Sequence, residues 1–414
     1  MPELSPTQLQ QLRQLLDEVD GANPFWTARL HQAGVTAQSL NSLKDLRRLP
    51  ILMKAELVAD QAANPPYGSN LTYAPQAYVR FHQTSGTTGR PMPWLDTAAS
   101  WDRLCRCWGQ IYELAGCRTG DVVAVPFSFG PFIGFWGAFE AAPQAGMRAL
   151  PMGGMSSEQR LRMLREHAAT VVCGTPTYML RLAEVAERGG DDLRGTAVRT
   201  LIVAGEPGGN VPAVRQRLEE VWDARVIDHW GMTDVGALGV EPADAPGGLV
   251  LLEEDCVAEI LDPDTGRDTQ DGETGELIIT NLTRAGCPVI RYRTGDLVRP
   301  RGRHPATGWQ WLEGGVLGRG DDMLTIRGMN VFPSAVESIV RESAGVAEFR
   351  LRVTQRQSMD HLIVEVEPAA AADAESLCVE VARRLHDRLH FRAEVRPVAE
   401  LPRFELKAKR LVRE

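Results

Sequence analysis

The sequence lacks the features that would place the chain in a membrane, on nucleic acid or in a disulfide framework. No apolar run in the 414 residues reaches the ~18 residues of a membrane-span candidate, and the polar N-terminal segment MPELSPTQLQQLRQLLDEVD has no apolar signal core. Acidic residues outnumber basic ones by 54 to 45, and the net charge of −9 disfavours nucleic acid as a partner. We therefore expect a cytoplasmic protein without a nucleic-acid or membrane partner.

Cysteine is sparse and scattered. The seven cysteines form no pair of C-x-x-C clusters, and such a set is typical of a reducing cytosol. Cys378 lies beside a predicted apolar helix face, and we interpret it as core filling. The length predicts two or three domains, and the contents of 43% apolar and 24% charged residues are those of an ordinary globular protein.

Between about residues 120 and 230 the sequence alternates apolar runs with helical patterns. The runs that we expect to be strands are Asp121–Phe127, Thr170–Pro176, Thr200–Gly209 and Ala224–Gly231. Continuous apolar strands alternating with helices predict a buried parallel sheet. Such sheets bind ligands at the carboxyl ends of their strands. We expect polar or Gly-rich turns there at Gly174–Pro176, Gly205–Gly209 and Trp230–Asp234.

The pattern changes after about residue 250. Short runs with turn signals up to about residue 312 predict antiparallel β structure. Beyond Gly318 the order is strand, helix, two strands, helix and strand, which is the ferredoxin-like split unit. The predicted fold is a large domain, residues 1–318, with parallel sheets and helices plus an antiparallel β subdomain. A small α+β ferredoxin-like domain, residues 319–414, follows it.

No Walker loop is present, yet one stretch has the chemistry to hold phosphate. In HQTSGTTGRP, residues 82–91, the glycines Gly86 and Gly89 are three apart and no lysine follows. A Walker loop needs G-x-x-x-x-G-K-[ST], so the spacing excludes a P-loop phosphotransferase. Glycines still let backbone N–H groups approach an anion, and the hydroxyls and Arg90 add donors and charge. Taken alone, such a loop is more often a solvated turn.

Five further motifs follow this loop in order. They are GEP, DHWGMTD, YRTGDL, GRGDDMLTIRGMNVFPSAVE and LPRFELKAKR, which begin at residues 205, 228, 292, 318 and 401. With these motifs the chain resembles the adenylate-forming superfamily of acyl-CoA synthetases, luciferases and peptide-synthetase adenylation domains. SLKDLRRLPILMKAEL, CGTPTYMLRLAE and the ending LPR-x-x-x-KAKR are most similar to the phenylacetate–CoA ligase group. The resemblance extends from about residue 25 to the C-terminus. It implies an enzyme that uses ATP and magnesium, with CoA as co-substrate.

The resemblance implies a role for each matched residue of the large domain and for Arg319 at the domain junction. The outer phosphates of ATP would be bound by Thr84, Ser85, Gly86, Thr87, Thr88, Gly89 and Arg90. The adenine and ribose would be bound by Gly205, Glu206, Pro207, Asp228, Trp230, Asp296 and Arg319. Trp230, where relatives usually have Tyr, would stack on adenine, and Asp296 would accept both ribose hydroxyls. Thr233 would contact the α-phosphate, and Asp234, where relatives usually place Glu, would bind magnesium.

The same resemblance places the catalytic lysine in the small domain. Lys407 matches the lysine that in relatives bridges the substrate carboxylate and the α-phosphate, and a compact ammonium suits that position. Lys409, two residues on, is the competing assignment. Asp321 matches the hinge about which the small domain rotates between adenylation and thioesterification.

The acid pocket is predicted from the aromatic run PFSFGPFIGFWGAF, residues 126–139. Its candidate lining is Phe132, Ile133, Trp136, Gly153, Gly154, Gly231 and Met232. The alternative, that these aromatics are ordinary core, carries equal weight because aromatics dominate cores. The run has no acidic residue for an α-ammonium, which favours an aryl or arylalkyl acid over an amino acid.

Two negative expectations concern metal and histidine. Some relatives carry a Cys/His metal cluster after the magnesium motif, but the segment GALGVEPADAPGGLVLLEEDC, residues 236–256, has only Cys256 and no histidine, so no structural zinc is expected. His82 and His229 lie in site motifs but match no catalytic position, and we interpret them as structural neighbours.

The sequence therefore predicts an acid–thiol ligase that forms an acyl adenylate from an aromatic acid and passes the acyl group to a thiol, expected to be CoA. Two alternatives stay open. The thiol is instead the phosphopantetheine arm of a carrier protein, as in aryl-AMP ligases of secondary metabolism. In another class, the chain is a non-catalytic adenylate-fold ligand sensor, which Asp296, Arg319 and Lys407 disfavour.

Overall fold

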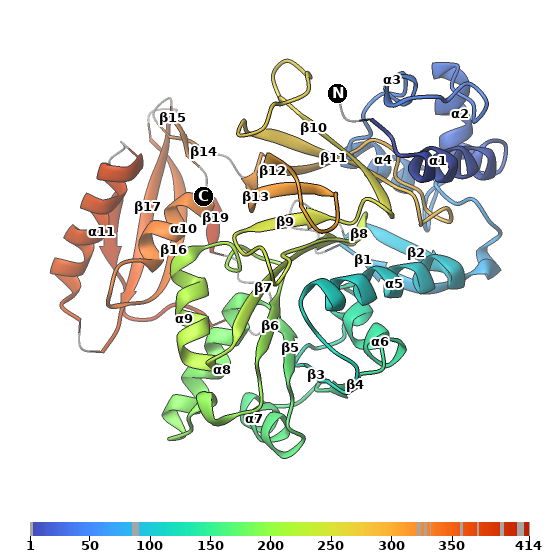
Figure 1. Ribbon diagram of the computed structural model, residues 1–414. Coiled ribbons are helices and arrows are strands. Elements are labelled where there is room, and N and C mark those ends of the chain that lie inside the picture. The colour runs from blue at the N-terminus through green and yellow to red at the C-terminus, as the bar shows by residue number, and fades with distance from the viewer. Residues whose placement is uncertain are drawn as a thin grey trace.

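The computed structural model describes residues 3–84, 91–320, 324–326, 329–331, 333–356, 359–370, 372–389, 393–403 and 410–413. In this part of the chain the strands form sheets of eleven, six and two strands. The eleven-stranded sheet runs through the larger body, and the six-stranded sheet lies beside it with its own helices (Figure 1). No helix of the described residues is long and apolar enough to cross a membrane.

One half of the eleven-stranded sheet is parallel, as the sequence predicts. Its strands are β3 (Val122–Val125), β4 (Arg148–Pro151), β5 (Val171–Gly174), β6 (Thr200–Val203) and β7 (Arg225–Met232). Their spatial order is β7-β6-β5-β3-β4, and every neighbouring pair is parallel. β3, β5 and β6 are buried at every position, which explains their continuous apolar sequences. β4, which the sequence pattern missed, is a short, partly exposed strand at the edge.

Helices cover both faces of this parallel half (Figure 1). α5 (Ala98–Leu114) and α6 (Trp136–Gln144) lie on one face, and α7 (Ser157–Glu166), α8 (Pro176–Arg188) and α9 (Pro212–Trp222) lie on the other. Successive strand residues point to opposite faces. Val123 and Val125 therefore join the core under α5 and α6, whereas Val122 and Ala124 join the core under the other three helices.

The other half of the sheet is antiparallel, also as predicted. Its strands are β8 (Gly236–Val240), β9 (Gly248–Leu251), β10 (Cys256–Leu261), β11 (Gly275–Asn281), β12 (Tyr292–Arg303) and β13 (Gln310–Arg319). β7 joins the two halves, because it is parallel to β6 and antiparallel to β8. Trp230, at which the predicted strand Ala224–Gly231 and the predicted turn Trp230–Asp234 overlap, therefore lies inside β7 opposite Gly239. Pairing with β8 extends β7 beyond the point where its parallel neighbour ends.

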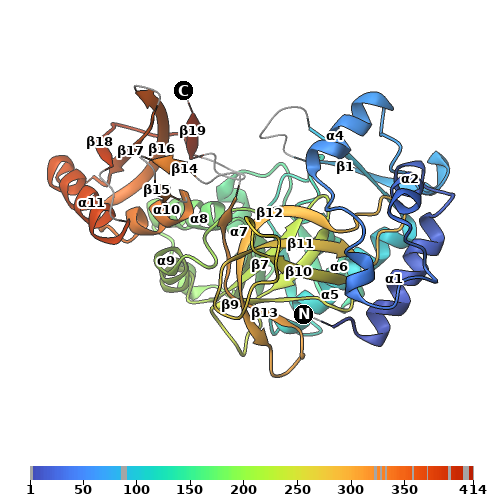
Figure 2. The same ribbon diagram turned by 90° about the horizontal axis from the view of Figure 1, so that it is seen from above.

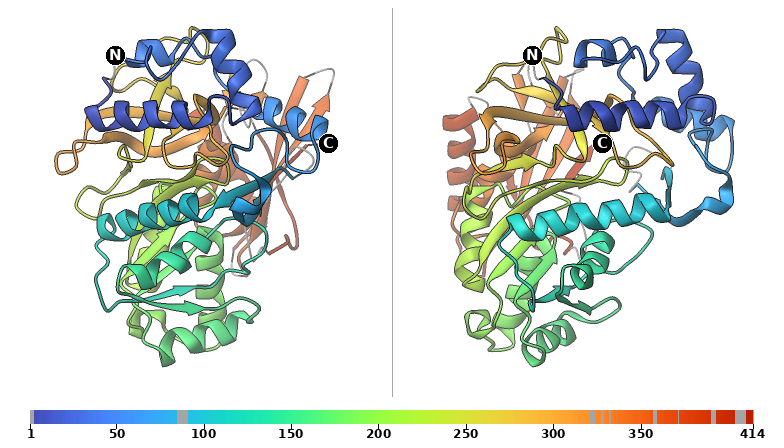
Figure 3. Two further views of the ribbon diagram at one scale, coloured as in Figure 1. Left: turned by 90° about the vertical axis from the view of Figure 1, so that its right-hand side faces the viewer. Right: turned by 45° about the vertical axis from the view of Figure 1, so that its right-hand side comes forward.

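The N-terminal segment packs on the antiparallel half and leads to a hairpin. Its helices are α1 (Pro6–Val19), α2 (Pro24–Ala33), α3 (Leu43–Leu46), α4 (Lys54–Ala63) and the 3-10 helix η1 (Pro75–Ala77). α1 lies along the antiparallel strands (Figure 3), where Gln8 Nε2 donates a hydrogen bond to the Cys256 carbonyl at 2.9 Å. β1 (Tyr78–Gln83) and β2 (Pro93–Thr97) then form the two-stranded sheet. This hairpin carries the predicted phosphate loop between its strands.

The C-terminal part forms the six-stranded sheet and lies to one side of the larger body (Figure 2). Its elements are β14 (Leu324–Ile326), β15 (Met329–Val331), α10 (Pro333–Arg341), β16 (Val346–Arg356), β17 (Met359–Pro368), α11 (Ala374–Leu389), β18 (Glu394–Pro397) and β19 (Leu411–Arg413). The predicted order of strands and helices is confirmed, with β15 and β19 in addition. The six-stranded sheet and its helices share their own core, beside which Cys378 is buried. The boundary at residue 318 stays a prediction.

Candidate active site

A buried tryptophan and carboxylate lie at the junction of the two halves of the large sheet. Trp230 in β7 is 8% exposed, and its Nε1–H donates to Asp296 Oδ2 at 2.8 Å. Asp296 in β12 is 4% exposed, and Arg319 in β13 lies with Nη1 at 3.4 Å from Asp296 Oδ1. Asp296 and Arg319 are direct partners in the pairing of β12 with β13. The structure thus brings together three residues that the motifs place in separate parts of the sequence.

Asp228 lies two residues before Trp230 on the same strand. Burial, together with the nearby carboxylate of Glu241, raises the pKa of Asp228 to about 7. The turn after β6 approaches it closely, because a Cβ on Gly209 would lie 2.3 Å from Asp228 Oδ1. Only glycine fits there, so the Gly205–Gly209 turn can lie directly against this carboxylate.

The turn after β6 also contacts helix α8. Glu206 Oε1 accepts a hydrogen bond from the Thr177 backbone N–H at 2.8 Å. Gly205 has φ of +91°, which favours glycine, whereas Pro207 is exposed. The predicted adenine-binding turn is therefore fixed to the N-terminal end of α8, at the carboxyl edge of the parallel strands.

The predicted phosphate loop is closed at its base. Thr84 N donates to the Met92 carbonyl at 3.0 Å, and Met92 N donates to Thr84 Oγ1 at 3.1 Å. Thr84 is buried, and Ser85, Gly86, Thr87, Thr88, Gly89 and Arg90 lie outside the described residues. His82 stacks on Trp101, and burial lowers the pKa of His82 to about 4. A neutral, stacked imidazole agrees with the structural role expected for His82.

A buried ion pair connects this hairpin to the end of β7, and sequence reasoning missed it. Arg284 and Asp96 are each 1% exposed, and the guanidinium donates to both carboxylate oxygens at 2.7 and 2.8 Å. Arg284 Nη1 also donates to the Thr233 carbonyl at 2.6 Å. Asp96 belongs to β2, so the pair holds Thr233 beside the phosphate-loop hairpin. Arg284 and Asp96 are 188 residues apart in the sequence, so no local motif indicates that they form a pair.

Asp234, the expected magnesium ligand, is 1% exposed and already has two partners. Its Oδ2 accepts a hydrogen bond from the Tyr292 hydroxyl at 2.5 Å and lies 3.4 Å from Lys54 Nζ. Both contacts use Oδ2, and among the described residues no contact is recorded for Oδ1, which is therefore the oxygen that could bind a cation. Magnesium in nucleotide sites is bound by one or two carboxylates together with substrate phosphates and water. The single carboxylate therefore fits a magnesium ion that is also bound by phosphate.

The aromatic run forms a cluster of edge-to-face rings. Phe129 contacts Phe127, Trp136 and Phe139 at ring-centroid distances of 6.0, 4.8 and 5.2 Å. Phe129 itself has φ of +51°, which is uncommon for a bulky residue. Of the predicted lining residues, Phe132, Ile133 and Trp136 are partly exposed. Phe127, Phe129 and Phe139, which sequence reasoning did not single out, are partly exposed beside them.

The remaining predicted acid-pocket residues lie on two other segments. Gly153 and Gly154 follow β4 and are exposed, and a Cβ on Gly153 would lie 3.1 Å from Phe129 Cδ2. Gly231 and Met232 end β7, where a Cβ on Gly231 would lie 2.6 Å from the Gly236 carbonyl. The run is also joined to the phosphate hairpin, because Gln83 N donates to the Pro131 carbonyl at 2.8 Å.

His229 lies in β7 against the same core. Its Nδ1 is 2.6 Å from the Gly239 carbonyl, and its ring is 4.5 Å from that of Trp108. Burial lowers the pKa of His229 to about 4, so the ring is neutral near pH 7. Trp108 also contacts Phe135 of the aromatic run, with ring centroids 6.2 Å apart. His229 therefore supports the aromatic run through Trp108, in agreement with a structural role.

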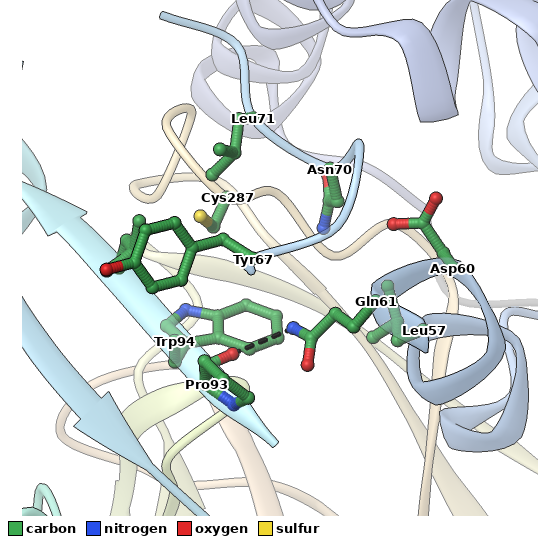
Figure 4. A pocket seen from close by; sticks show the side chains of 10 residues that line it. Leu57, Asp60, Gln61, Tyr67, Asn70, Leu71, Pro93, Trp94 and Cys287 are labelled. Atoms are coloured by element: carbon green, nitrogen blue, oxygen red, sulfur yellow. Dashed lines mark hydrogen bonds between the residues drawn. The ribbon is translucent and has the colours of Figure 1, made fainter. Parts of the chain in front are cut away.

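A small pocket opens behind the hairpin, beside the Arg284–Asp96 pair, since Arg284 lies over the ring of the lining residue Trp94. It lies between α4, residues 67–71 and β2, and Gln61 Nε2 donates there to the Pro93 carbonyl at 2.8 Å (Figure 4). Trp94 Nε1 has no hydrogen-bond partner among the described residues. None of the predicted site residues lines this pocket.

Several predicted residues lie outside the described part of the chain. They are Asp321, Lys407 and Lys409, in addition to residues 85–90 of the phosphate loop. Within the described residues no group of three or more His, Cys, Asp or Glu side chains could hold a metal ion.

The eleven-stranded mixed sheet and the smaller C-terminal sheet with its own helices define the fold class of adenylate-forming acid–thiol ligases. The chain belongs to the AMP-binding enzyme family. Residues 38–283 match that family, and residues 328–414 match the AMP-binding enzyme C-terminal domain. A phenylacetate-coenzyme A ligase of Aromatoleum evansii is 32% identical over 368 residues, which cover 88% of this chain and 82% of that protein.

Solved structures confirm the fold class. A 2-hydroxyisobutyryl-CoA ligase in its postadenylation state, in complex with 2-HIB-AMP, is 31% identical and has a TM-score of 0.92, with 98% of this chain and 88% of that chain covered. The same ligase in its thioesterification state, with CoA, covers the same shares of both chains with a TM-score of 0.74. The sequence identity is 31% in both comparisons, so the difference in TM-score reflects the state of the ligase and not its sequence.

Proposed function

We propose that this protein activates an aryl or arylalkyl carboxylic acid with ATP, as an acyl adenylate, and transfers the acyl group to the thiol of CoA. The observation that carries the proposal is the cluster formed by buried Trp230 and Asp296 with partly exposed Arg319. The Arg284–Asp96 pair places the end of β7, which holds Trp230, beside the hairpin of the phosphate loop. A nucleoside and its phosphates would therefore bind in one continuous site.

Each large-domain residue has a binding or orienting task in this proposal. Trp230 would stack on adenine, and Asp228 would accept a hydrogen bond from its amine group. The 84–90 loop would bind the outer phosphates and release them as pyrophosphate, while Thr233 would contact the α-phosphate. Asp234 would hold magnesium, which when bound disperses the charge of the departing pyrophosphate.

The carboxylate of the acid has to meet the α-phosphate, and this requires positioning more than covalent catalysis. Lys407 would bridge the two reacting groups and neutralise negative charge as it develops. Rotation about Asp321 would then remove Lys407 and admit the thiol.

The aromatic cluster supports an aromatic acid. Phe127, Phe129, Trp136 and Phe139 are partly exposed and pack edge to face in the segment that in the family supplies the acid pocket. Aromatic rings bind preferentially in edge-to-face or offset arrangements of this kind. The ligases to which the chain is similar are named for phenylacetate and for 2-hydroxyisobutyrate, so these relatives alone do not choose the acid.

A panel of acids tests the proposal directly. ATP–pyrophosphate exchange would be measured with benzoate, phenylacetate, 2-hydroxyisobutyrate and phenylalanine, and we expect the aryl or arylalkyl acids to give the highest rates. Exchange with 2-hydroxyisobutyrate alone would contradict the acid assignment. Complete absence of exchange, despite ATP binding, would instead favour the ligand-sensor alternative.

Two lysine variants test the catalytic assignment. Lys407→Ala should slow exchange by about 100-fold or more, because it removes a charge that acts on the reacting phosphate. Lys409→Ala is the matched control and should exchange at nearly the wild-type rate. A larger loss in the Lys409 variant would transfer the role to that residue.

The thiol acceptor is tested separately. The preformed aryl adenylate would be offered with CoA and with a phosphopantetheinylated carrier protein side by side. We expect thioester formation on CoA. Transfer to the carrier protein alone would identify the enzyme as an aryl-AMP ligase of the carrier-loading type.

A further inference from the structure

Arg410, the first described residue after Lys407, is firmly held within the C-terminal sheet. It is 9% exposed and directly precedes β19. Its Nε donates to Glu348 Oε1 at 3.0 Å and its Nη1 to Glu337 Oε1 at 3.2 Å, and the guanidinium lies over the Phe349 ring. Its carbonyl accepts from Leu351 N at 2.7 Å. The guanidinium therefore has a fixed position within the small domain.

One nitrogen of this guanidinium reaches the large domain. Arg410 Nη2 donates to Thr177 Oγ1 at 3.0 Å, as well as to Glu348 Oε2 at 3.2 Å. Thr177 is the second residue of α8, and its backbone N–H donates to Glu206 of the predicted adenine turn. A path of hydrogen bonds thus joins the small domain to the turn that is predicted to bind adenine.

We propose that Thr177 and Arg410 form a latch that holds the small domain in the orientation in which the acid is adenylated. The latch rests on the proposed function, and it assigns Thr177 and Arg410 as positioning residues. Thr177 belongs to the large domain and Arg410 to the small one. Their 3.0 Å contact therefore exists only while the two domains keep this relative orientation.

Two observations connect this orientation with adenylation. First, only Ala408 and Lys409 separate Lys407 from Arg410 in the sequence, so anchoring Arg410 limits how far the catalytic lysine can move from the large domain. Second, the TM-score is 0.92 to the 2-hydroxyisobutyryl-CoA ligase in the postadenylation state and 0.74 to the thioesterification state. The latch contact therefore accompanies the arrangement that is similar to the postadenylation state.

The latch is weak enough to open. The contact is a single hydrogen bond, and Thr177 is partly exposed. A hydrogen bond from a charged donor changes a two-state equilibrium by roughly tenfold. A contact of this size can favour one orientation without preventing the rotation that the thiol-transfer step needs.

The test removes the Thr177 hydroxyl and measures the two half-reactions separately. Thr177→Val keeps the shape of the side chain, and Thr177→Ser keeps the hydroxyl. Thr196→Val is a matched control, because the Thr196 hydroxyl donates only to the Leu193 carbonyl, in the turn after the 3-10 helix η2 (Leu193–Gly195). Pyrophosphate exchange reports adenylation, and acyl transfer to CoA from preformed adenylate reports the second step.

We expect Thr177→Val to slow exchange up to about tenfold while acyl transfer from preformed adenylate keeps its rate or becomes faster. Thr177→Ser and Thr196→Val should behave like the wild type. Equal slowing of both half-reactions by Thr177→Val, or an unchanged exchange rate, would overturn the latch.

A distance measurement separates the latch from the proposed function. Spin labels at Glu187→Cys in α8 and Asp387→Cys in α11 report the domain orientation, and both positions are exposed. Six of the native cysteines are buried and Cys117 is partly exposed, so Cys117→Ser provides the background. Thr177→Val should broaden or shift the distance distribution, and an unchanged distribution would refute the latch. The distance measurement tests the latch even if no acid supports pyrophosphate exchange. Absence of exchange would contradict the proposed function and not the latch.

Discussion

Replacing Trp230 with phenylalanine should weaken ATP binding. We expect the loss to come from the contact between Asp296 and the ribose, and not from stacking on the adenine. The indole Nε1–H donates to Asp296 Oδ2 at 2.8 Å, and both residues are more than nine-tenths buried. Phenylalanine keeps an aromatic face for stacking but has no donor. Asp296 would then lose the contact that fixes the orientation of its carboxylate.

The magnitude follows from what remains around Asp296. A hydrogen bond to a charged group contributes about 1.5–3 kcal/mol. Arg319 still lies 3.4 Å from Oδ1 in the variant, so the carboxylate does not become unpaired and the lower figure applies. A loss of about 1.5 kcal/mol corresponds to about a tenfold rise in the KM for ATP in pyrophosphate exchange.

The assay compares ATP with 2′,3′-dideoxy-ATP, which lacks both ribose hydroxyls. If Trp230 acts through Asp296, the Trp230→Phe penalty should be large with ATP and small with the dideoxy analogue, as in a double-mutant cycle. Asp296→Asn serves as the reference for a lost ribose carboxylate. Equal penalties with both nucleotides would refute the reasoning, because they would mean that Trp230 contributes only to adenine stacking.

Two further variants test the turn and the strand that face each other at Asp228. Gly209→Ala puts a Cβ 2.3 Å from Asp228 Oδ1 and should raise the KM for ATP or lower stability by about 1–3 kcal/mol. Gly109→Ala in α5 is the control. A Cβ there would have nothing within 4 Å, so this variant should raise the unfolding temperature. Because the pKa of Asp228 is raised to about 7, the folded state holds a proton that the unfolded state releases near pH 4. The contribution of Asp228 to stability should therefore fall as pH rises from about 4 to 7. The unfolding temperature of the Asp228→Asn variant, measured across that range, should lack this fall. Parallel pH profiles of the wild type and the variant would contradict the raised pKa.

The parallel half of the sheet was predictable because its strands are buried on both faces. β3, β5 and β6 are apolar at almost every position, and this leaves a continuous signal in the sequence. β4 gives no such signal, since it is a four-residue edge strand with exposed Arg148 and Pro151. Burial on both faces, rather than strand propensity, therefore made β3, β5 and β6 predictable and left β4 unpredicted.

Pairing partners were less predictable than strands. The predicted strand Ala224–Gly231 and the predicted turn Trp230–Asp234 overlap at Trp230, so the sequence did not decide where this strand ends. The strand continues through Trp230 only because β8 returns antiparallel to it. That return depends on a tight turn, in which Gly236 has φ of +90° and Gly231 lies against the Gly236 carbonyl.

The motifs predicted residue types for the site but not the contacts between them. Trp230 and Asp296 are 66 residues apart, and Thr177 and Arg410 are 233 residues apart. Hydrophobic periodicity in the sequence does not predict either pairing, because each contact depends on how separate elements pack. Arg284 was missed for the same reason, although it is the residue that connects Thr233 to the hairpin.

The charges beside Thr233 and Asp234 suggest a role for the small domain in the proposed reaction. In the described chain the cations at Thr233 and Asp234 are already balanced, Arg284 by Asp96 and Lys54 by Asp234 itself. Attack of a carboxylate on the α-phosphate, with pyrophosphate as the leaving group, needs positive charge that is not already neutralised. We infer that this charge comes from Arg90 of the loop, from magnesium and from Lys407. Of these, only Lys407 belongs to the small domain, so domain orientation should control the rate of adenylation far more than the affinity for ATP.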